Sequence, residues 1–377
     1  FQQAIQRLSE SSSVGWIPPI NQEWIMGFDV FPSSKQADAM TSTASMLNRF
    51  RIRRSMKWLL LFLVCVSPLL ARAEVSLEAL ATQRTLVLGD SITYGGHYVA
   101  DIEAYLRLHF PEASPQWLNL GLPSETVSGL SESGHAGGAF PRPDLHERLD
   151  RTLEAIQPEI VLACYGMNCG IYHPYHETRF EAFKVGMRRL HERVEATGAH
   201  IMHVTPPVFD AQPIAARTLP AGLETYPQAY AGYDEVLTLY SGWLVAMRAE
   251  GWEVIDLHGP MKAHLENQRR EKPNYLLAGD GVHMNQTAHW MAAQRILQAL
   301  GAAASTLAWP SSQAMSEARL ETPNELIPLI RKRHRLLCDA WLNRIGHLRP
   351  GMHKGPEWEE VMHQASSLHQ EIQALVP

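Results

Sequence analysis

Long apolar runs are scarce in this sequence, and the one that stands out is too short to cross a membrane. It covers residues 58–70 (WLLLFLVCVSPLL) and has thirteen residues, whereas a transmembrane helix needs about 20. A basic cluster precedes the run, and Ala71-Arg72-Ala73 follows it. This order is typical of a secretory signal peptide. We therefore expect cleavage after Ala73 and no stable membrane anchor afterwards.

A signal peptide should stand at the start of a protein, but 45 residues precede Met46 here. We interpret residues 1–45 as over-extended upstream translation and residues 46–73 as the signal peptide. The main folded domain is predicted over 74–305. Residues 306–377 are predicted to form a linker and a C-terminal helical extension. We expect an exported protein, either periplasmic or extracellular.

Cysteine is also scarce, with four residues in the whole sequence. Cys65 lies in the predicted signal peptide, which leaves Cys164, Cys169 and Cys338. An odd number of cysteines excludes a framework in which every thiol is paired, even in an oxidising compartment. At least one thiol is therefore expected to be free.

Basic residues are outnumbered after the predicted cleavage site. The remaining chain has 25 Lys and Arg against 35 Asp and Glu, a net charge of −10. Such a balance argues against nucleic acid or an anionic membrane surface as a partner. The sequence gives no indication of an oligomeric state.

The sequence does contain a regular alternation of short apolar runs with amphipathic stretches. Five apolar runs predict buried strands, at 85–89, 117–122, 160–165, 200–205 and 252–257. Residues 177–197 and 234–250 show helical spacing, with Gly198 and Gly251 where left-handed caps are expected. The alternation predicts parallel strands joined by crossover helices. We predict an α/β fold, a flavodoxin-like three-layer sandwich around a five-stranded parallel sheet.

The chain changes character after about Gly301. A linker rich in small residues leads to two further helical patterns, over 325–345 and 357–375. Glycine and proline separate the two patterns, so a C-terminal helical hairpin is predicted. Two interpretations are open: the hairpin packs against the core or a second subunit, or it forms a wall of the substrate cleft.

Two motifs carry residues suited to nucleophilic chemistry. Gly89-Asp90-Ser91 follows the first predicted strand, where a serine hydroxyl would lie at the carboxyl edge of the sheet. Asp280 stands three residues before His283 near the end of the domain. A hydroxyl needs a base to take its proton, and an imidazole needs an acceptor that fixes its tautomer. The pattern makes Ser91 a candidate nucleophile, with His283 and Asp280 as its candidate partners. The alternative interpretation is that Ser and Asp cap helices at these positions and that the histidine is incidental.

Two loops between these motifs offer hydrogen-bond donors. Gly121 follows the second predicted strand, where the backbone N–H of a glycine can approach a ligand closely. Asn168 follows the third, and its side-chain amide is a donor. Acyl transfer develops negative charge on the carbonyl oxygen, and donors aimed there contribute strongly to catalysis. The N–H groups of Ser91 and Gly121 and the Asn168 amide would make such an oxyanion hole. The alternative interpretation is a turn glycine and a turn asparagine.

Together the segments LVLGDSITYG, NLGLPSETVSG, YGMNCG and GDGVH resemble, in order, the four sequence blocks of the SGNH (GDSL-type) hydrolase family. The resemblance covers about residues 84–300. It implies the SGNH hydrolase fold, the same roles for the residues above, and ester hydrolysis without a cofactor. It departs from the family in the third block, where Cys169 follows Asn168 in place of the usual Asp. The missing carboxylate is expected to affect the support of the loop or the rate.

Further candidates come from the loops around these blocks. Predicted substrate-binding residues are Asp90, Tyr165, His173, Tyr175 and Arg142. Arg142 has an alternative interpretation as a surface ion-pair partner. The long loop at 206–232 and the Gly/Pro-rich loop at 135–144 are predicted binding loops. Cys169, His173 and His176 are possible zinc ligands, but their spacing matches no structural zinc pattern, and we predict no metal.

The sequence thus predicts a serine ester hydrolase that needs no cofactor. Its expected substrate is an O-acyl ester, an O-acetyl group on a carbohydrate above all, in a small molecule or a polysaccharide. Two alternatives stay open. One is a lipase or thioesterase of the same family, and the other is a non-catalytic carbohydrate-binding protein on the same scaffold.

Overall fold

The structure is a computed structural model that describes residues 75–376. The predicted upstream segment, 1–45, and the predicted signal peptide, 46–73, lie outside the described residues. No helix in the described range is both long and apolar enough to span a bilayer.

Five parallel strands form one sheet in the order β2-β1-β3-β4-β5. They are β1 (Arg84–Gly89), β2 (Gln116–Asn119), β3 (Ile160–Cys164), β4 (His200–Val204) and β5 (Glu253–Ile255). All five predicted strands are present, most of them a residue or more shorter at the carboxyl end than expected. Beyond these ends single hydrogen bonds to the neighbouring strand persist, such as that from the Leu120 N–H to the Val87 carbonyl at 2.8 Å and that from the Thr205 N–H to the Ile255 carbonyl at 3.0 Å, but the regular ladder does not continue.

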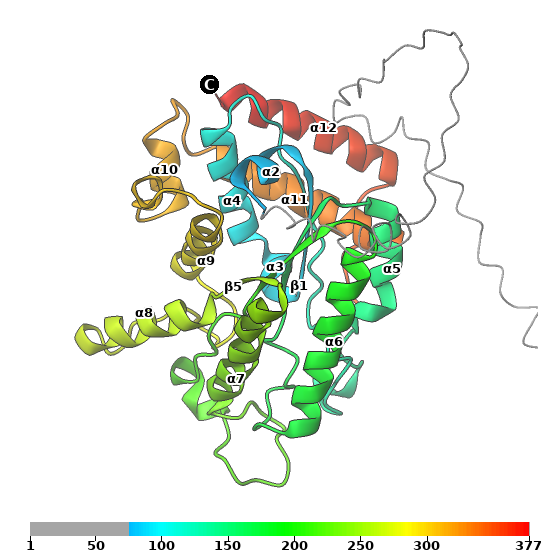
Figure 1. Cartoon of the computed structure of the whole chain (residues 1–377), viewed down its shortest axis with the longest axis vertical. Helices are drawn as coiled ribbons and strands as arrows, with labels where there is room; N and C mark the ends of the chain where they lie inside the picture. Colours follow the sequence, from blue (N-terminus) through cyan, green and yellow to red (C-terminus); the bar gives the residue numbers. More distant parts are fainter. Residues whose placement is uncertain (1–74, 377) are drawn as a thin grey trace, which may run out of the picture. The chain divides into compact units, whose positions relative to one another are not determined.

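Helices cover both faces of the sheet, which explains why the strands are apolar throughout. On one face lie α4 (His97–His109) and α9 (Gln286–Ala299). On the other lie α5 (Leu145–Ile156), α6 (Glu177–Glu195) and α7 (Tyr233–Ala246) (Figure 1). This arrangement follows from right-handed crossovers, since the chain moves one way from β1 to β2 and the other way afterwards. The predicted three-layer α/β fold is confirmed.

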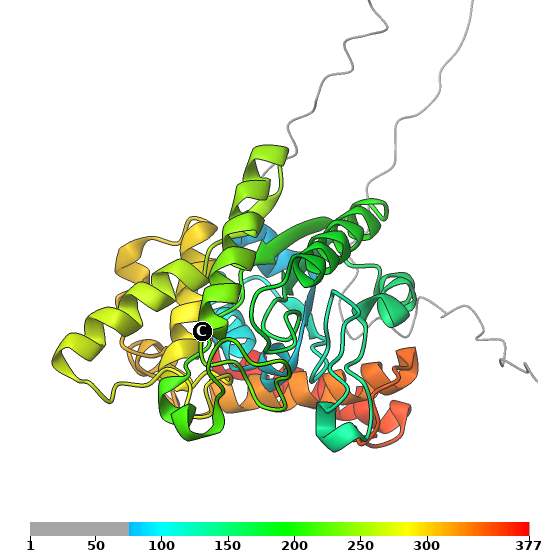
Figure 2. The same ribbon diagram turned by 90° about the horizontal axis from the view of Figure 1, so that it is seen from below.

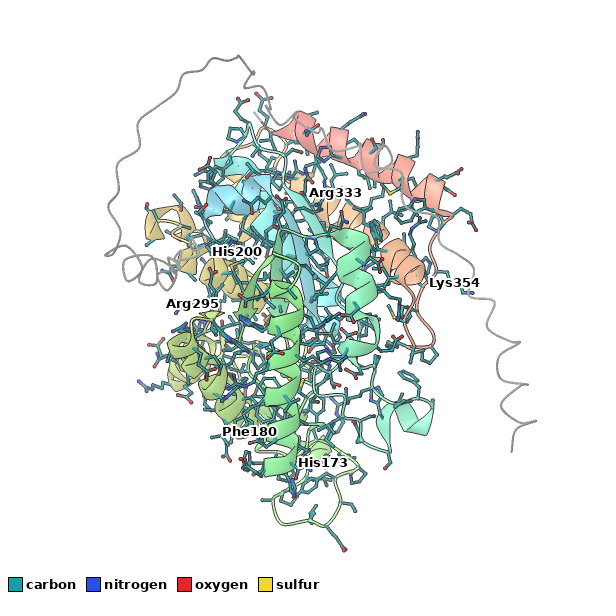
Figure 3. The ribbon with its side chains drawn as sticks, turned by 45° about the vertical axis from the view of Figure 1, so that its right-hand side comes forward. His173, Phe180, His200, Arg295, Arg333 and Lys354 are labelled. Atoms are coloured by element: carbon teal, nitrogen blue, oxygen red, sulfur yellow. The ribbon has the colours of Figure 1, made fainter. Side chains whose placement is uncertain are left out.

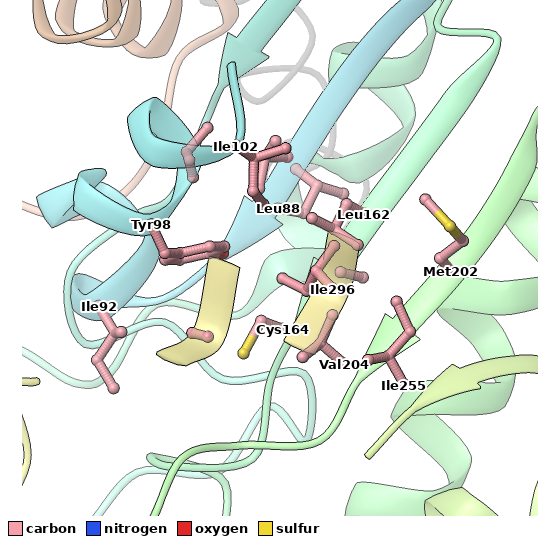
Figure 4. Close-up of a cluster of buried hydrophobic side chains, with 14 of the residues drawn as sticks. Leu88, Ile92, Tyr98, Ile102, Leu162, Cys164, Met202, Val204, Ile255 and Ile296 are labelled. Atoms are coloured by element: carbon pink, nitrogen blue, oxygen red, sulfur yellow. The ribbon is translucent and has the colours of Figure 1, made fainter. Parts of the chain in front are cut away.

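The hydrophobic core lies between the sheet and these helices. Leu162 and Val204 of the sheet lie beside Ile296 of α9 and Tyr98 of α4, and all four are buried (Figure 4). Shorter elements complete the described chain: α2 (Leu77–Thr82) packs on α4, and α8 (His258–Glu271) packs on α7.

Two predicted helix ends match the structure closely. The helix expected over 177–197 is α6, and Gly198 follows it with φ +86°. The helix expected over 234–250 is α7 followed by a 3-10 turn at Met247–Glu250, which ends at Gly251 with φ +88°. Glycine adopts this left-handed conformation without the steric cost that a side chain brings.

The C-terminal helical hairpin is also present. It consists of α11 (Leu326–Ile345) and α12 (Trp358–Leu375), which pack on each other along most of their length. The segment predicted as a linker is folded in part, as a 3-10 turn at Ala304–Leu307 and as α10 (Ser312–Glu317), which packs on α4. The first helix of the hairpin contacts β2, α4 and α5, so it covers the β2 edge of the sheet. An uncovered strand edge would present unpaired backbone groups.

A buried ion cluster fastens the hairpin to the core. Glu103 of α4 is fully buried and accepts hydrogen bonds from Arg107 Nε at 2.7 Å and Arg333 Nη2 at 2.7 and 2.9 Å. His334 Nε2 lies 2.5 Å from the same carboxylate. Burial alone would raise the pKa of Glu103, but the charges of Arg333, Arg107 and His334 outweigh it and hold this pKa well below its ordinary value. Since Arg333 and His334 belong to α11, the Glu103 carboxylate joins the hairpin to α4, one of the helices that cover the sheet.

We expect Glu103→Gln to lower the free energy of unfolding by about 3–5 kcal/mol, because it leaves buried cations without their carboxylate. Urea unfolding at pH 7 measures this, with the exposed Glu154→Gln as a matched control that should change stability by no more than about 0.5 kcal/mol. Equal unfolding free energies for the two variants would contradict the structural role of Glu103.

The wild type and Glu103→Gln also test how the contribution of Glu103 to stability depends on pH. Because the pKa of Glu103 is depressed in the folded state, its contribution is complete above the unfolded-state pKa of about 4.3. It is lost as the pH falls from there towards the folded-state value. The stability difference between the wild type and Glu103→Gln should therefore shrink below about pH 4.

Candidate functional site

The site lies where the strand order reverses. The chain leaves β1 towards β2 on one side and returns to β3 on the other, and in such sheets the crevice at the carboxyl ends is the usual ligand site. Figure 2 views the molecule from the side of the loops that follow the strands, with α11 along one side of them. Ser91 is the first residue of α3 (Ser91–Gly95), directly after β1.

Ser91, His283 and Asp280 form one hydrogen-bonded chain. Ser91 Oγ lies 2.8 Å from His283 Nε2, and His283 Nδ1 lies 2.6 Å from Asp280 Oδ2. The residues are 192 and three positions apart in the sequence, respectively. With Nδ1 held by the carboxylate, Nε2 is free to accept the serine proton. The structure therefore brings together the three residues that the sequence motifs singled out.

The Asp280 carboxylate is fixed by its own loop. Its Oδ1 accepts the backbone N–H groups of Val282 at 3.0 Å and His283 at 2.7 Å, which leaves Oδ2 for the imidazole. Partial burial raises the pKa of Asp280, but these hydrogen bonds together with that from the His283 ring lower it more. The net pKa lies below the ordinary value, so the group is a carboxylate at neutral pH. About half of each side chain, His283 and Asp280, is exposed.

Asp90 has a structural place rather than the substrate contact predicted for it. It is buried and caps α3, with Oδ1 accepting the backbone N–H of Ile92 at 2.9 Å. Burial raises the pKa of Asp90 to about 6, and the Ile92 N–H and the charge of His283 oppose this rise in part. The cap positions the first turn of α3, and with it Ser91.

Gly121 is not available as the predicted oxyanion donor. Its N–H already donates to Asn119 Oδ1 at 2.9 Å. A Cβ at this position would lie 2.3 Å from the backbone N of Tyr94, so glycine is required here by the close approach of α3. Gly121 thus allows the loop after β2 to pack closely against α3.

Ser124 offers the donor that the motif analysis missed. The turn Leu122–Glu125 is closed by the Glu125 N–H donating to the Leu122 carbonyl at 3.1 Å. Pro123 and Ser124 are its central residues, and Ser124 has φ +68°, a conformation that glycine or asparagine usually supplies in type II turns. The Ser124 N–H makes no hydrogen bond within residues 75–376. The sequence signal for this turn is Pro123 followed by Ser124, which stands where such a turn usually has a glycine.

Asn168 is buried, and its amide orientation is determined by its neighbours. Its Oδ1 accepts from Arg142 Nη1 at 3.1 Å and from the Tyr172 hydroxyl at 3.0 Å. Its Nδ2 donates to the Glu125 carbonyl at 3.2 Å, which attaches it to the loop that contains Ser124. Since Nδ2 carries two hydrogens, one remains for a ligand.

Arg142 is committed to the protein rather than free for substrate. Nε and Nη2 donate to the two carboxylate oxygens of Glu132 at 2.7 and 2.6 Å, and the guanidinium lies 5.2 Å from the centre of the Tyr172 ring. This bidentate geometry is the strong form of an Arg–carboxylate pair. The predicted direct substrate contact does not fit this arrangement, whereas the ion-pair interpretation does. The ion pair between Arg142 and Glu132 positions Arg142 Nη1 so that it donates to Asn168 Oδ1.

The other predicted substrate-binding residues have different surroundings. Tyr165 is buried, and its hydroxyl donates to Glu125 Oε2 at 2.6 Å, which does not fit a substrate contact. Tyr175 is exposed and its hydroxyl bonds to Glu177. His173 is half-buried beside Tyr226, with 5.5 Å between ring centres, and lies at the opposite end of the molecule from Arg333 (Figure 3). Of the three, His173 remains the candidate at a binding loop.

Cys169 is fully buried, and burial raises the pKa of its thiol to about 12. A thiol is therefore present at neutral pH, not the thiolate that binds zinc. Among residues 75–376, no group of three or more His, Cys, Asp or Glu side chains is arranged to hold a metal ion. Cys164 and Cys338 are buried as well, and neither they nor Cys169 form a disulfide.

Comparison with known proteins adds one family match. A model described as the GDSL-like Lipase/Acylhydrolase family matches residues 87–291, which confirms the resemblance of the sequence blocks. No curated protein matches the chain.

Two solved structures illustrate the fold similarity. A gut microbial diltiazem-metabolizing enzyme aligns at 18% identity and a TM-score of 0.45, over 59% of this chain and 47% of its own. The chain thus spans about half the length of that enzyme. Axe2, an acetylxylan esterase from Geobacillus stearothermophilus, aligns at 20% identity and a TM-score of 0.44, over 59% of this chain and 96% of its own.

The strained turn makes a prediction about stability. Ser124→Gly should raise the free energy of unfolding by about 1 kcal/mol, because a left-handed conformation costs a residue with a side chain roughly that much. Ser124→Ala keeps the Cβ and is the matched control, expected to change stability little. Urea unfolding of both variants tests this, and a Ser124→Gly protein less stable than Ser124→Ala would contradict it.

Proposed function

Because this chain belongs to the GDSL-like lipase/acylhydrolase family and is a carboxylic ester hydrolase, we propose that Ser91 is its nucleophile. The observation that carries this proposal is the continuous chain of hydrogen bonds from Ser91 Oγ through His283 to Asp280. Such a chain supplies the base that a hydroxyl needs and the acceptor that fixes the tautomer of that base.

The reaction proceeds in two steps. Ser91 Oγ attacks the ester carbonyl carbon while His283 Nε2 takes the hydroxyl proton. The tetrahedral intermediate collapses, the alcohol leaves with the proton from His283, and the acyl group stays on Ser91. Water then attacks the acyl carbon with His283 as base, which releases the acid and restores the serine. Asp280 orients the ring and stabilises its protonated form throughout.

Three donors stabilise the developing oxyanion in this proposal. They are the backbone N–H of Ser91, the backbone N–H of Ser124 and Nδ2 of Asn168. Ser124 takes the place first given to Gly121, because the Gly121 N–H is already donated to Asn119. The hydrogen bond from Asn168 Nδ2 to the Glu125 carbonyl, in the residue after Ser124, supports this grouping of the second and third donors. Donors held before the reaction need no reorganisation when charge develops.

The substrate that we propose is an O-acyl ester on a carbohydrate, with acetyl as the acyl group. Beside the family resemblance, the long loop after β4 supports this. It brings Tyr226 within 5.5 Å of the His173 ring and within 6.0 Å of Tyr230, all three of them half-buried. Half-buried aromatic rings present an apolar face and a polar edge, which suits a sugar. Export of the enzyme is proposed from the basic cluster, apolar run and Ala71-Arg72-Ala73 of the sequence.

The central test is release of acetate from 4-nitrophenyl acetate and from acetylated xylan, with protein beginning at Glu74. Ser91→Ala should lower turnover of both at least about 10³-fold, as removal of the nucleophile does in other triads. Ser366→Ala on α12, an exposed serine, is the matched control and should leave turnover unchanged.

The outcomes separate the candidate functions. Serine-dependent release from both substrates supports a carbohydrate esterase. A strong preference for long acyl chains on 4-nitrophenyl esters would favour a lipase or thioesterase instead. Glycan binding that survives Ser91→Ala, together with no turnover in the wild type, would overturn the catalytic proposal in favour of a binding protein.

Arg142 should act as a positioning residue for Asn168. We expect Arg142→Met to lower kcat for 4-nitrophenyl acetate about tenfold, a loss of about 1.4 kcal/mol in transition-state stabilisation. KM should change less than twofold, because Arg142 does not touch the substrate. Arg142→Lys, which can still donate one hydrogen bond, should restore part of the rate.

The exposed Arg270→Met is the control for this experiment. Rates are divided by the fraction of protein that reacts with a serine-directed fluorophosphonate, so that misfolded protein does not count. A raised KM with unchanged kcat would show that Arg142 binds the substrate directly.

A further inference from the structure

A cavity of about 370 Å³ lies between the middle of α11 and the junction of α3 and α4. Tyr94 and Gly96 line it from the junction, and Arg331, Lys332 and Arg335 line it from α11. The proposed mechanism makes no use of this space. Its lining contains three Lys and Arg side chains and no Asp or Glu, together with His334, which is paired with Glu103.

Two of the three cations, Lys332 and Arg331, form no ion pair within 4.0 Å in the described chain, although the charge of Arg331 opposes in part the rise that burial causes in the pKa of Asp101. Lys332 makes no hydrogen bond or ion pair there. Arg331 Nη2 lies 2.6 Å from His97 Nε2. Burial, followed by the charges of Arg331 and Arg335, lowers the pKa of His97. The partner of Arg331 is therefore a neutral imidazole, which satisfies a hydrogen bond but not a charge.

The third cation is only partly compensated. Arg335 Nη2 donates to the Tyr94 carbonyl at 2.8 Å, and its guanidinium stacks 3.7 Å from the centre of the Tyr94 ring. Its Nη1 is buried, makes no hydrogen bond and lies 4.0 Å from Asp339 Oδ1. Within residues 75–376, Asp339 is the only carboxylate within 4.0 Å of any of the three cations. That carboxylate also accepts the Tyr94 hydroxyl at 2.8 Å.

The surplus of positive charge contrasts with the rest of the chain, whose net charge after residue 73 is −10. Arg331 and Lys332 are exposed and Arg335 is half-buried. Like charges gathered on one wall repel each other, and together they attract an anion. Two guanidinium groups and an ammonium group suit an oxyanion such as a carboxylate or a phosphate.

The cavity begins one helical turn from the nucleophile. Tyr94 follows Ser91 by three residues on α3, a spacing that puts their Cβ atoms about 5–6 Å apart. The Tyr94 hydroxyl and carbonyl are both bonded to α11 residues, so the hairpin and the nucleophile helix form this wall together. A substrate group bound here would lie within the reach of one or two sugar units from Ser91.

We propose that this cavity binds an anionic group of the ester substrate, a carboxylate such as that of an acidic sugar, through Lys332, Arg331 and Arg335. The inference rests on the proposed function and narrows it, because it selects esters on acidic carbohydrates over those on neutral ones. Lys332 is the residue of choice for a test. Its ammonium has no partner in the described chain, so replacing it leaves the internal hydrogen bonds intact.

The kinetic test compares two esters that differ only in the carboxylate, a monoacetylated methyl glucuronide and the matched methyl glucoside. In the wild type, kcat/KM for the glucuronide should exceed that for the glucoside about tenfold, mainly through a lower KM. Lys332→Gln should reduce this ratio at least about threefold and leave turnover of 4-nitrophenyl acetate unchanged. Lys354→Gln, the same change at an exposed position between α11 and α12 (Figure 3), should alter neither value.

A binding test separates this inference from the catalytic proposal. Isothermal titration of the Ser91→Ala protein with sodium glucuronate, at constant ionic strength, should show binding that Lys332→Gln weakens. This readout does not need turnover, so it can succeed even where the assignment of Ser91 fails.

Three results would overturn the inference. A glucuronide-to-glucoside ratio near one, or a ratio that Lys332→Gln leaves unchanged, would exclude a substrate carboxylate in the cavity. Binding of inorganic phosphate with no binding of glucuronate would show instead that the cavity holds a free anion.

Discussion

The buried carboxylate of Glu125 holds the site together. It accepts two hydrogen bonds from Arg148 at 2.7 Å and one from the Tyr165 hydroxyl at 2.6 Å, and all three side chains are buried. Burial raises the pKa of Glu125, while Arg148 and Tyr165 oppose the rise, and the bidentate geometry requires the carboxylate. An ionised group without water must have all its hydrogen bonds satisfied internally. This requirement fixes the relative positions of α5, the end of β3 and the loop after β2.

The loop after β2 and the loop after β3 carry two of the proposed oxyanion donors, the Ser124 N–H and the Asn168 amide. Arg148 Nη2 also donates to the Leu120 carbonyl at 2.8 Å, and Asn168 Nδ2 donates to the Glu125 carbonyl. The turn with Ser124 and the amide of Asn168 are therefore attached to one buried network. Glu132 and Arg142 add a second attachment from the opposite side of the Asn168 amide. With this support, Cys169 in place of an aspartate need not loosen the loop, because other polar groups hold it.

The sequence was sufficient to predict the features that depend on a local pattern of residues. It was insufficient where the role of a residue depends on a hydrogen-bond partner. Buried parallel strands are recognisable as apolar runs. Ser91 stands directly after the end of β1, and Asp280 and His283 stand three residues apart in one loop. Whether the N–H of Gly121 is free depends on the side chain of Asn119, and whether Arg142 is free depends on Glu132. Hydrophobic periodicity contains neither piece of information. The prediction for Gly121 also took glycine as a mark of ligand approach, when here it marks the approach of α3.

The C-terminal hairpin shows the same limit and also connects stability to the site. Its helical spacing was readable, but its place against β2 depends on Arg333 and His334 meeting Glu103 of α4. Once α11 is fastened there, Arg335, within the same turn, and Asp339, less than two turns further along, meet Tyr94, which follows Ser91 by three residues on α3. The contact that closes the edge of the sheet thus also determines what lies beside the nucleophile helix. The contacts of α11 with β2, α4 and α5 confirm that the hairpin packs against the core, and its role as a wall of the substrate cleft stays a prediction that follows from where the core holds it.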